Sequence, residues 1–262
     1  MSAEKGKMGF LNALHDEYCN KKCGTITKAR EFLNSLAGQE EDVFNSFKEI
    51  YHKVAEEFAK NNNTRKHRST KNWRWEKEPA LGPKNTSREK QLEKKVVLKV
   101  QSTEESEQWA NQVPVASGVF SIDDKGRLID LVYRINEGSY EFIELKIDDE
   151  NPVYAAFEVL LYGMMYVFYR KHVILAVKKD AEKELLKANS IMLTVAAPRK
   201  YYRGYAHLDK FQNVLSRQLS QWVSGKIAGL KMEFRFDCFD YDGSKEITEE
   251  HVGNFLSRKP YC

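Results

Sequence analysis

The feature that most constrains the fold of this 262-residue chain is the stretch 127–146, which has the pattern of two apolar strands joined by a turn at 136–138. Each strand carries charge where a buried strand is normally apolar. Asp130 interrupts the first strand, and Glu144 and Lys146 interrupt the second. Because burying an unpaired charge is costly, the fold must pair these side chains with one another or supply them with a metal ion.

The register of this hairpin decides whether the charges meet. Residues two apart in a strand share a face, so Glu144 and Lys146 point the same way. A three-residue loop over 136–138, ending in Gly138 in the left-handed conformation, places Asp130 directly across from Glu144. A two-residue loop would place Asp130 on the opposite face unless a bulge restored the phase. We therefore predict the three-residue loop.

The convergence of two carboxylates and one ammonium favours a metal site. Carboxylate oxygens suit a hard divalent ion, and Mg²⁺ is commonly held by one or two carboxylates together with water and substrate phosphate. Such an ion can generate hydroxide from bound water and stabilise charge on a phosphoryl oxygen, while a neighbouring lysine orients the water or stabilises the transition state. The alternative is a buried structural ion pair between the same side chains.

Composition excludes some classes of protein. Hydrophobic residues make up 42% and charged residues 31%, which is typical of a soluble globular protein. The apolar stretch 153–169 is shorter than the roughly 20 residues of a membrane span and contains Glu158, so we expect a buried core helix and no membrane association. Without a signal-peptide pattern, we expect a cytoplasmic protein with reduced cysteines. The cysteines are Cys19, Cys23, Cys238 and Cys262.

The pattern of apolar residues and breaks predicts four regions along the chain. They are an N-terminal helical region over 1–60, a basic linker over 61–85, a core over 86–240 and a peripheral tail over 241–262. The N-terminal helices are expected to pack on the core or to serve a protein partner or a homodimer contact.

Within the core, we expect one leading helix, several strands and two further helices. Thr86 and Glu89 have the spacing of a capping box that opens the leading helix, and Glu93 on that helix could point into a site. The expected strands after it are 118–122, the hairpin, 191–197 and 232–238, with helices over 152–169 and 208–222. The segment 173–187 is ambiguous between strand and helix.

Two basic segments are candidates for nucleic-acid binding. Residues 60–90 contain ten Lys or Arg against three acidic residues, with tryptophans between them. Basic side chains neutralise phosphates and aromatic faces stack on unpaired bases. The candidates are Arg65, Lys66, Arg68, Lys71, Trp73 and Arg74, and, in a loop after the expected strand 191–197, Arg199, Lys200 and Arg203. The alternative for the first segment is a solvated linker whose tryptophans dock on the domain.

Asp130, thirteen intervening residues and then Glu144-Leu145-Lys146, in this order of elements, resemble the PD-(D/E)XK, or restriction-endonuclease-like, nuclease superfamily. The resemblance covers roughly 86–240 and implies an α/β fold with a mixed central sheet flanked by helices. It implies that Asp130, Glu144 and the backbone carbonyl of Leu145 bind Mg²⁺ or Mn²⁺, and that Lys146 assists the attacking water. Glu93 is the candidate for a further acidic ligand.

The resemblance extends to the helix after the motif and implies a function. Glu158 and Tyr162 have the spacing of the Gln-x-x-x-Tyr motif of the RecB-like branch, with Glu replacing Gln, and would support the site. The implied activity is metal-dependent hydrolysis of nucleic-acid phosphodiester bonds, with DNA favoured and RNA not excluded. The alternative is a non-catalytic nucleic-acid-binding or protein-interaction module on the same fold.

Overall fold

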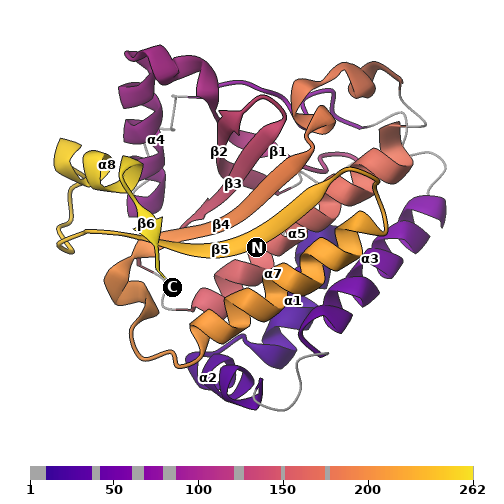
Figure 1. The fold of residues 1–262 in the computed structure, drawn as a ribbon, viewed down its shortest axis with the longest axis horizontal. Helices are drawn as coiled ribbons and strands as arrows, with labels where there is room; N and C mark the ends of the chain where they lie inside the picture. The colour runs from indigo at the N-terminus through magenta and orange to yellow at the C-terminus, as the bar shows by residue number, and fades with distance from the viewer. Residues whose placement is uncertain are drawn as a thin grey trace, which may run out of the picture.

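The chain folds around one mixed β-sheet with helices on both faces (Figure 1). The computed structural model describes residues 10–36, 42–60, 68–78, 87–120, 127–148, 151–174 and 178–261. Within these residues the protein is mixed α/β, with six strands and seven α-helices. The helices α4 and α8 cover one face of the sheet, and α5 and α7 cover the other, with α1 and α3 packed outside them (Figure 1).

The six strands lie in the sheet in the order in which they occur in the chain. They are β1 (Trp109–Pro114), β2 (Leu128–Asn136), β3 (Ser139–Leu145), β4 (Ser190–Pro198), β5 (Lys231–Phe239) and β6 (Lys259–Pro260). The first three are antiparallel neighbours, β3, β4 and β5 run parallel, and β6 is antiparallel to β5. The two parallel connections require crossovers, which α5 and α7 provide.

The seven α-helices are α1 (Phe10–Lys22), α2 (Ile26–Ser35), α3 (Asp42–Lys60), α4 (Arg88–Gln101), α5 (Pro152–Phe168), α7 (Leu208–Ser224) and α8 (Glu249–Leu256). A π-helical turn, Tyr169–Val173, extends α5, and short 3-10 turns follow over Lys178–Glu182 and Glu184–Lys187. The ambiguous segment 173–187 is therefore helical in its described part. Two further 3-10 turns, Glu104–Gln108 and Arg199–Tyr202, flank β1 and β4.

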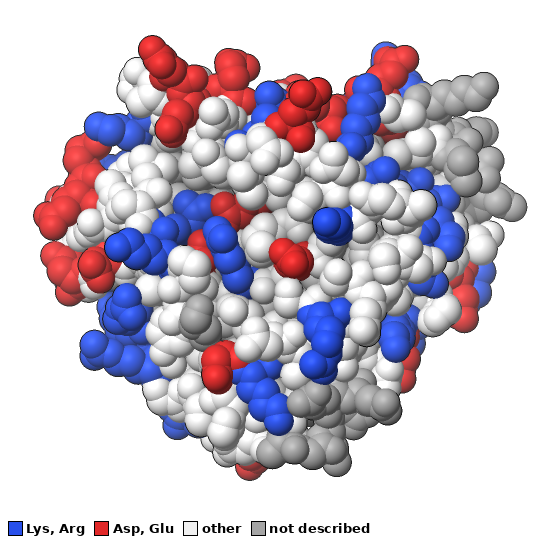
Figure 2. All heavy atoms as spheres, viewed as in Figure 1, with Lys and Arg blue, Asp and Glu red and all other residues white. Residues whose placement is uncertain are grey.

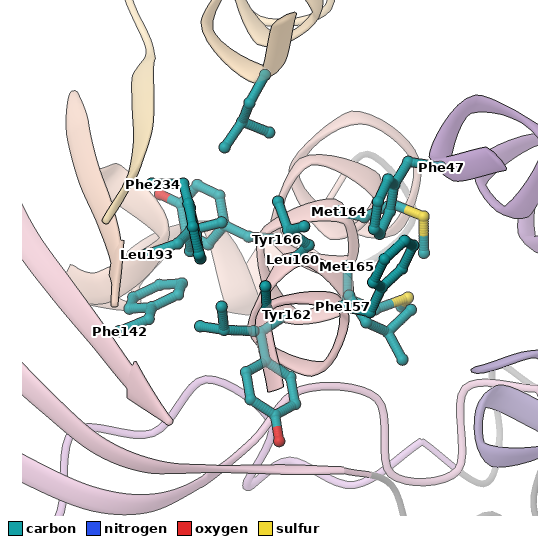
Figure 3. Close-up of a cluster of buried hydrophobic side chains, with 14 of the residues drawn as sticks. Phe47, Phe142, Phe157, Leu160, Tyr162, Met164, Met165, Tyr166, Leu193 and Phe234 are labelled. Carbon is teal, nitrogen blue, oxygen red and sulfur yellow. The ribbon is translucent and has the colours of Figure 1, made fainter. Parts of the chain in front are cut away.

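The central helix α5 is buried on nearly all sides (Figure 3). Pro152 occupies its first turn, and the Asn151 side chain caps it by accepting from the backbone N–H of Tyr154. A Cβ on Gly163 would lie 2.6 Å from Leu193, so glycine allows α5 to approach β4 closely. With its π turn, Pro152–Val173 is long and apolar enough to cross a membrane, but most of it is buried within the protein, as expected for a core helix.

The N-terminal helices share a single apolar core with α5 and α7. Phe47 of α3 stacks on Phe157 of α5 with ring centroids 4.8 Å apart, and Leu11 of α1 is buried in the same cluster. A second, smaller core lies between α4, α8 and the opposite face of the sheet. The described helices α1 and α3 are thus an additional layer packed on α5 and α7.

The hairpin between β2 and β3 has the register that brings Asp130 toward Glu144, but its turn differs from the predicted one. Asn136 pairs with Ser139, which leaves a two-residue turn, so the predicted three-residue loop is wrong. A bulge between Arg134 and Asn136 shifts the register, and Gly138 has the expected positive φ of +72°. On the side of the bulge away from the turn, from Arg134 back to Leu131, the ladder therefore has the phase that brings Asp130 toward Glu144.

Two other predictions about elements are wrong. The strand expected over 118–122 is a turn in its described part, 118–120, and the strand instead lies at Trp109–Pro114, where Pro114 is tolerated because it ends an edge strand. The tail after residue 240 is not merely peripheral, since α8 packs on α4 and β6 pairs with β5. These three elements, β1, α8 and β6, are short and carry no long apolar pattern, so the sequence gives little local signal for them. Their burial depends on contacts with residues distant in the chain.

Candidate active site

The site begins where β2 and β3 separate. The ladder between them ends at the pair of Leu131 with Ile143, and beyond it Oδ2 of Asp130 accepts a hydrogen bond at 3.1 Å from the backbone N–H of Leu145. The carboxylate thus replaces a backbone acceptor between the parted strands. Gln112 of β1, next to this point, has a φ of +49°, which is uncommon for a residue other than glycine and costs backbone energy.

The predicted residues Glu144 and Lys146 meet at the end of β3. Nζ of Lys146 lies 2.8 Å from Oε1 of Glu144 and 2.7 Å from Oε2 of Glu158. Tyr162 donates its hydroxyl to Oε2 of Glu144 at 3.0 Å, and Figure 3 shows this hydroxyl pointing away from the apolar cluster around α5. The two residues predicted as support, Glu158 and Tyr162, therefore each hold one member of the Glu144–Lys146 pair.

A relay from α1 reaches this centre and was not predicted. Arg127, just before β2, lies 3.2 Å from Oε1 of Glu158, and its Nε donates to Oδ1 of Asn12 at 2.8 Å. Asn12 thus orients Arg127, which orients Glu158, which in turn holds Lys146. A cation directly before the charged strand is a weak local signal for Arg127, whereas nothing near Asn12 in the sequence connects α1 with residues more than a hundred positions away.

Glu93 of α4 lies on the other side of Asp130 and is fully occupied by donors. It is only 1% exposed. Its Oε1 accepts from Asn111 at 2.7 Å and from Gln112 at 2.8 Å, while its Oε2 accepts from Lys90 at 2.9 Å. Glu93 points into the site, as predicted, and its connection with Asp130 is made by the Lys90 ammonium.

The start of α4 differs from the predicted capping box. Thr86 lies outside the described residues, and the Ser87 side chain caps the helix by accepting from the backbone N–H of Lys90. Glu89 is not part of a box. Its carboxylate accepts from the backbone N–H of Ile147 at 3.1 Å, which adds a further acid beside the end of β3.

The carboxyl groups around Asp130 outnumber the cations beside them. Burial raises the pKa of Glu144 well above its usual value, and the negative charge of Asp130 raises it further, against the opposing effect of Lys146. Burial and Asp130 likewise raise the pKa of Glu93, and burial raises that of Glu89. These carboxyls would be stabilised by an additional cation, because two nearby lysines do not neutralise them all.

Glu158 and Lys146 show the opposite balance. Burial alone would raise the pKa of Glu158, but Lys146 and Arg127 outweigh it and lower this pKa. Burial alone would lower the pKa of Lys146, but Glu144 and Glu158 outweigh it and raise this pKa well above its usual value. Lys146 is therefore held protonated and fixed between two carboxylates.

The donor set fits a hard divalent ion held by few protein ligands. Asp130 and Glu144 supply carboxylate oxygens on either side of Leu145, whose carbonyl stays a predicted ligand. In the described part of the chain no three His, Cys, Asp or Glu residues are grouped so as to hold a metal. Mg²⁺ often takes only one or two carboxylates and completes its shell with water and substrate oxygens, which matches this pair.

Comparisons of the chain with protein-family models, with curated proteins and with solved structures found no match. The chemistry of the site is therefore inferred from its own residues. Those residues are an acidic pair, a fixed lysine and a surrounding shell drawn from α1, α4, α5 and β1.

Three of the predicted nucleic-acid-binding residues are built into the protein instead. Trp73 is fully buried and packs against Phe142, with ring centroids 6.1 Å apart, so it cannot stack on a base. Arg68 forms a nearly buried ion pair with Asp180 at 3.0 Å, and Arg74 pairs with acidic neighbours, one at 2.7 Å. The described part of this segment, 68–78, is therefore docked on the domain through Trp73 and the ion pairs of Arg68 and Arg74, as the alternative expected of the tryptophans.

The remaining basic candidates divide into two groups. Arg65 and Lys66 lie outside the described residues, whereas Lys71, Arg199, Lys200 and Arg203 are exposed. Arg199 and Lys200 lie in the 3-10 turn after β4, and Arg203 directly follows that turn. Because the backbone N–H of Lys146 donates to the carbonyl of Ala196 on β4, this turn begins at the same edge of the sheet as the site. Figure 2 shows acidic side chains gathered at the left rim, which carries α8, and along the top rim, with most of the basic side chains scattered over the middle and lower part of this face.

Proposed function

We propose that this protein is a metal-dependent nuclease that hydrolyses phosphodiester bonds, with DNA as the favoured substrate. The observation that carries the proposal is the surplus of buried carboxylates around Asp130 and Glu144 beside a lysine locked in its protonated form. A purely structural ion pair would be balanced in charge, whereas this site leaves negative charge for a cation to neutralise. The restriction-endonuclease-like arrangement of the sheet belongs to the same proposal.

Each side chain has a distinct role in this proposal. Asp130 and Glu144 hold a divalent ion, which when bound supplies an activated water and neutralises charge on the phosphate. Lys146, fixed by Glu144 and Glu158, orients the attacking water and offers its ammonium to the developing negative charge. Tyr162 fixes the rotamer of Glu144 by its hydrogen bond.

The approach of the substrate is assigned to the exposed basic turn after β4. Arg199, Lys200 and Arg203 lie at the edge of the sheet where β3 and β4 end beside the site. Their charges attract a phosphate backbone over a distance set by ionic strength. Arg68, Trp73 and Arg74 take no part in this proposal because they are engaged within the protein.

A cleavage assay tests the proposal directly. The full chain is incubated with plasmid and with single-stranded DNA in Mg²⁺ or Mn²⁺, and then in EDTA. We expect metal-dependent degradation that Asp130→Ala and Lys146→Ala reduce by about 10³-fold or more, since a metal site contributes several kcal/mol to such reactions. Glu137→Gln, in the exposed turn of the same hairpin, is the matched control and should retain full activity.

Two outcomes would contradict the proposal. Cleavage that survives both substitutions would belong to another site or to a contaminant. DNA binding without cleavage in any metal, and equal in the wild type and in Asp130→Ala, would instead favour a nucleic-acid-binding module on this fold.

A further inference from the structure

Lys90 occupies an electrostatically unfavourable position on its own helix. It lies in the first turn of α4, where the helix dipole repels a cation. Its ammonium is stabilised there by two carboxylates, since Nζ lies 2.6 Å from Oδ1 of Asp130 and 2.9 Å from Oε2 of Glu93. The ammonium therefore provides positive charge at the centre of the acidic cluster.

The contact with Asp130 involves the oxygen that a metal would need. Oδ2 of Asp130 accepts from the backbone N–H of Leu145, and Oδ1 is in contact with Lys90. A divalent ion bound to Oδ1 would lie within a few ångströms of the ammonium, where like charges repel strongly in a partly buried site. Binding of the ion to Asp130 and the contact of Lys90 with the same carboxylate therefore weaken one another.

Lys90 and Lys146 differ in their freedom to leave. The Lys90 side chain is 27% exposed, whereas that of Lys146 is 12% exposed and is clamped between Glu144 and Glu158. A lysine side chain is long and flexible and can extend its ammonium into water. Lys90 is thus the cation that can be exchanged, and Lys146 is the one that stays.

We propose that Lys90 is an internal counter-cation that competes with the divalent ion for Oδ1 of Asp130 and so sets the metal affinity of the site. This inference rests on the proposed function, because it presupposes metal binding at Asp130. The opposed explanation is a structural ion pair that ties α4 to β2. The two differ in sign: competition predicts tighter metal binding when the ammonium is removed, and a structural role predicts weaker or unchanged binding.

Calorimetric titration of the full chain with Mn²⁺ alone, without nucleic acid, separates them. We expect the dissociation constant of Lys90→Met to fall by about tenfold or more relative to wild type, the expected direction for loss of a competing charge. Lys90→Arg keeps the charge and should bind no more tightly than wild type. Lys99→Met removes a lysine from the same helix that contacts Glu249 of α8 at 3.6 Å, and should titrate as wild type does.

The results distinguish this inference from the proposed function. Equal or weaker binding by Lys90→Met, with a wild type that binds Mn²⁺, overturns the role of Lys90 and leaves the nuclease proposal standing. Binding by Lys90→Met but not by wild type supports competition in its strongest form. Absence of binding by both, in proteins shown to be folded, overturns both proposals.

A measurement on the wild type covers the case in which Lys90→Met does not fold. The protein is pulsed with an amine-acetylating reagent with and without Mn²⁺, and acetylation of Lys90 and Lys99 is compared by mass spectrometry. Release of Lys90 by the metal should raise its acetylation several-fold while Lys99 stays constant. Unchanged or reduced acetylation of Lys90 at saturating Mn²⁺ would overturn the competition.

Discussion

Strand β3 buries two glutamates three residues apart, and their surroundings differ in the sign of the charge balance. Glu141 is held by Arg235 at 2.8 Å, by Arg258 and by the hydroxyl of Thr194 at 2.7 Å. Although burial alone would raise the pKa of Glu141, the two arginines outweigh it and lower this pKa. Glu144 faces Asp130 and Lys146, and its pKa is raised. The comparison teaches that burial of a carboxylate does not by itself indicate a function, and that the proposed function rests on the charge balance around Glu144.

The largest expected effect comes from making the same substitution at each of the two glutamates. Glu144→Gln should abolish cleavage, because it removes a proposed metal ligand, while the protein stays folded. Glu141→Gln should leave the buried Arg258 and the half-buried Arg235 with Asp237 as their remaining acidic partner, and lower the free energy of unfolding by about 3 kcal/mol, as is usual for breaking a buried ion pair. Urea denaturation and cleavage, measured in parallel at a temperature where both proteins are folded, check both.

The roles assigned to the two glutamates would be reversed by one result. If Glu141→Gln lost cleavage in full while remaining folded, the Arg235–Arg258 cluster would be part of the catalytic machinery. If Glu144→Gln retained cleavage, the acidic cluster would be structural.

A smaller effect concerns pH. The raised pKa of Glu144 means that the folded protein holds a proton that the unfolded chain has already lost above its usual value of 4.5. Stability from this group therefore falls as pH rises above that value. Glu144→Gln should become progressively more stabilising relative to wild type as pH rises above about 5, as measured by thermal or urea unfolding without metal.

The pH trend has its own control in Glu141. With a lowered pKa, Glu141 contributes stability above the usual value of 4.5 that is lost as pH falls through its folded-state pKa. The effect of Glu141→Gln on stability should therefore stay constant over the same range. Parallel pH trends for the two variants would contradict the assigned charge balance.

The smallest expected effect tests the relay from α1. Asn12→Ala removes the acceptor of the Arg127 Nε hydrogen bond and should lower kcat by up to about tenfold, at the lower end for outer-shell partners of a metal site. Because Lys146 would be less well fixed, the loss should appear in kcat and in the pH profile rather than in KM. Asn34→Ala, exposed on α2, is the control. If Asn12→Ala kept the kcat of the wild type, α1 would have no role in the site.

Much of the fold could be predicted from local patterns. The apolar run of α5, the alternation along β5 and the charged hairpin each carry their own signal, and the structure has them within a few residues of the predicted bounds. Edge strand β1 and helix α8 were missed, because a short element gains most of its stability from packing. The turn of the hairpin was predicted with the wrong length, since a bulge and a longer loop give the same phase.

For the candidate site, the sequence by itself determined its centre. Asp130, Glu144 and Lys146 could be recognised because charge inside an apolar strand costs free energy and requires an explanation. Their two supporting residues, Glu158 and Tyr162, were predicted from the resemblance to the Gln-x-x-x-Tyr motif, and helical spacing adds only that they share a face. These are properties of strands and helices that hold wherever the element is placed.

Only the tertiary structure decided which residues surround that centre and which of its lysines is able to leave it. Asn12, Lys90 and Arg127 reach the site from elements whose positions depend on how α1, α4 and β2 pack. The same packing buried Trp73 and paired Arg68, so that two candidates for nucleic-acid binding became part of the internal structure. The physical reason is that burial and electrostatic energy depend on distance in space, and the sequence records only distance along the chain.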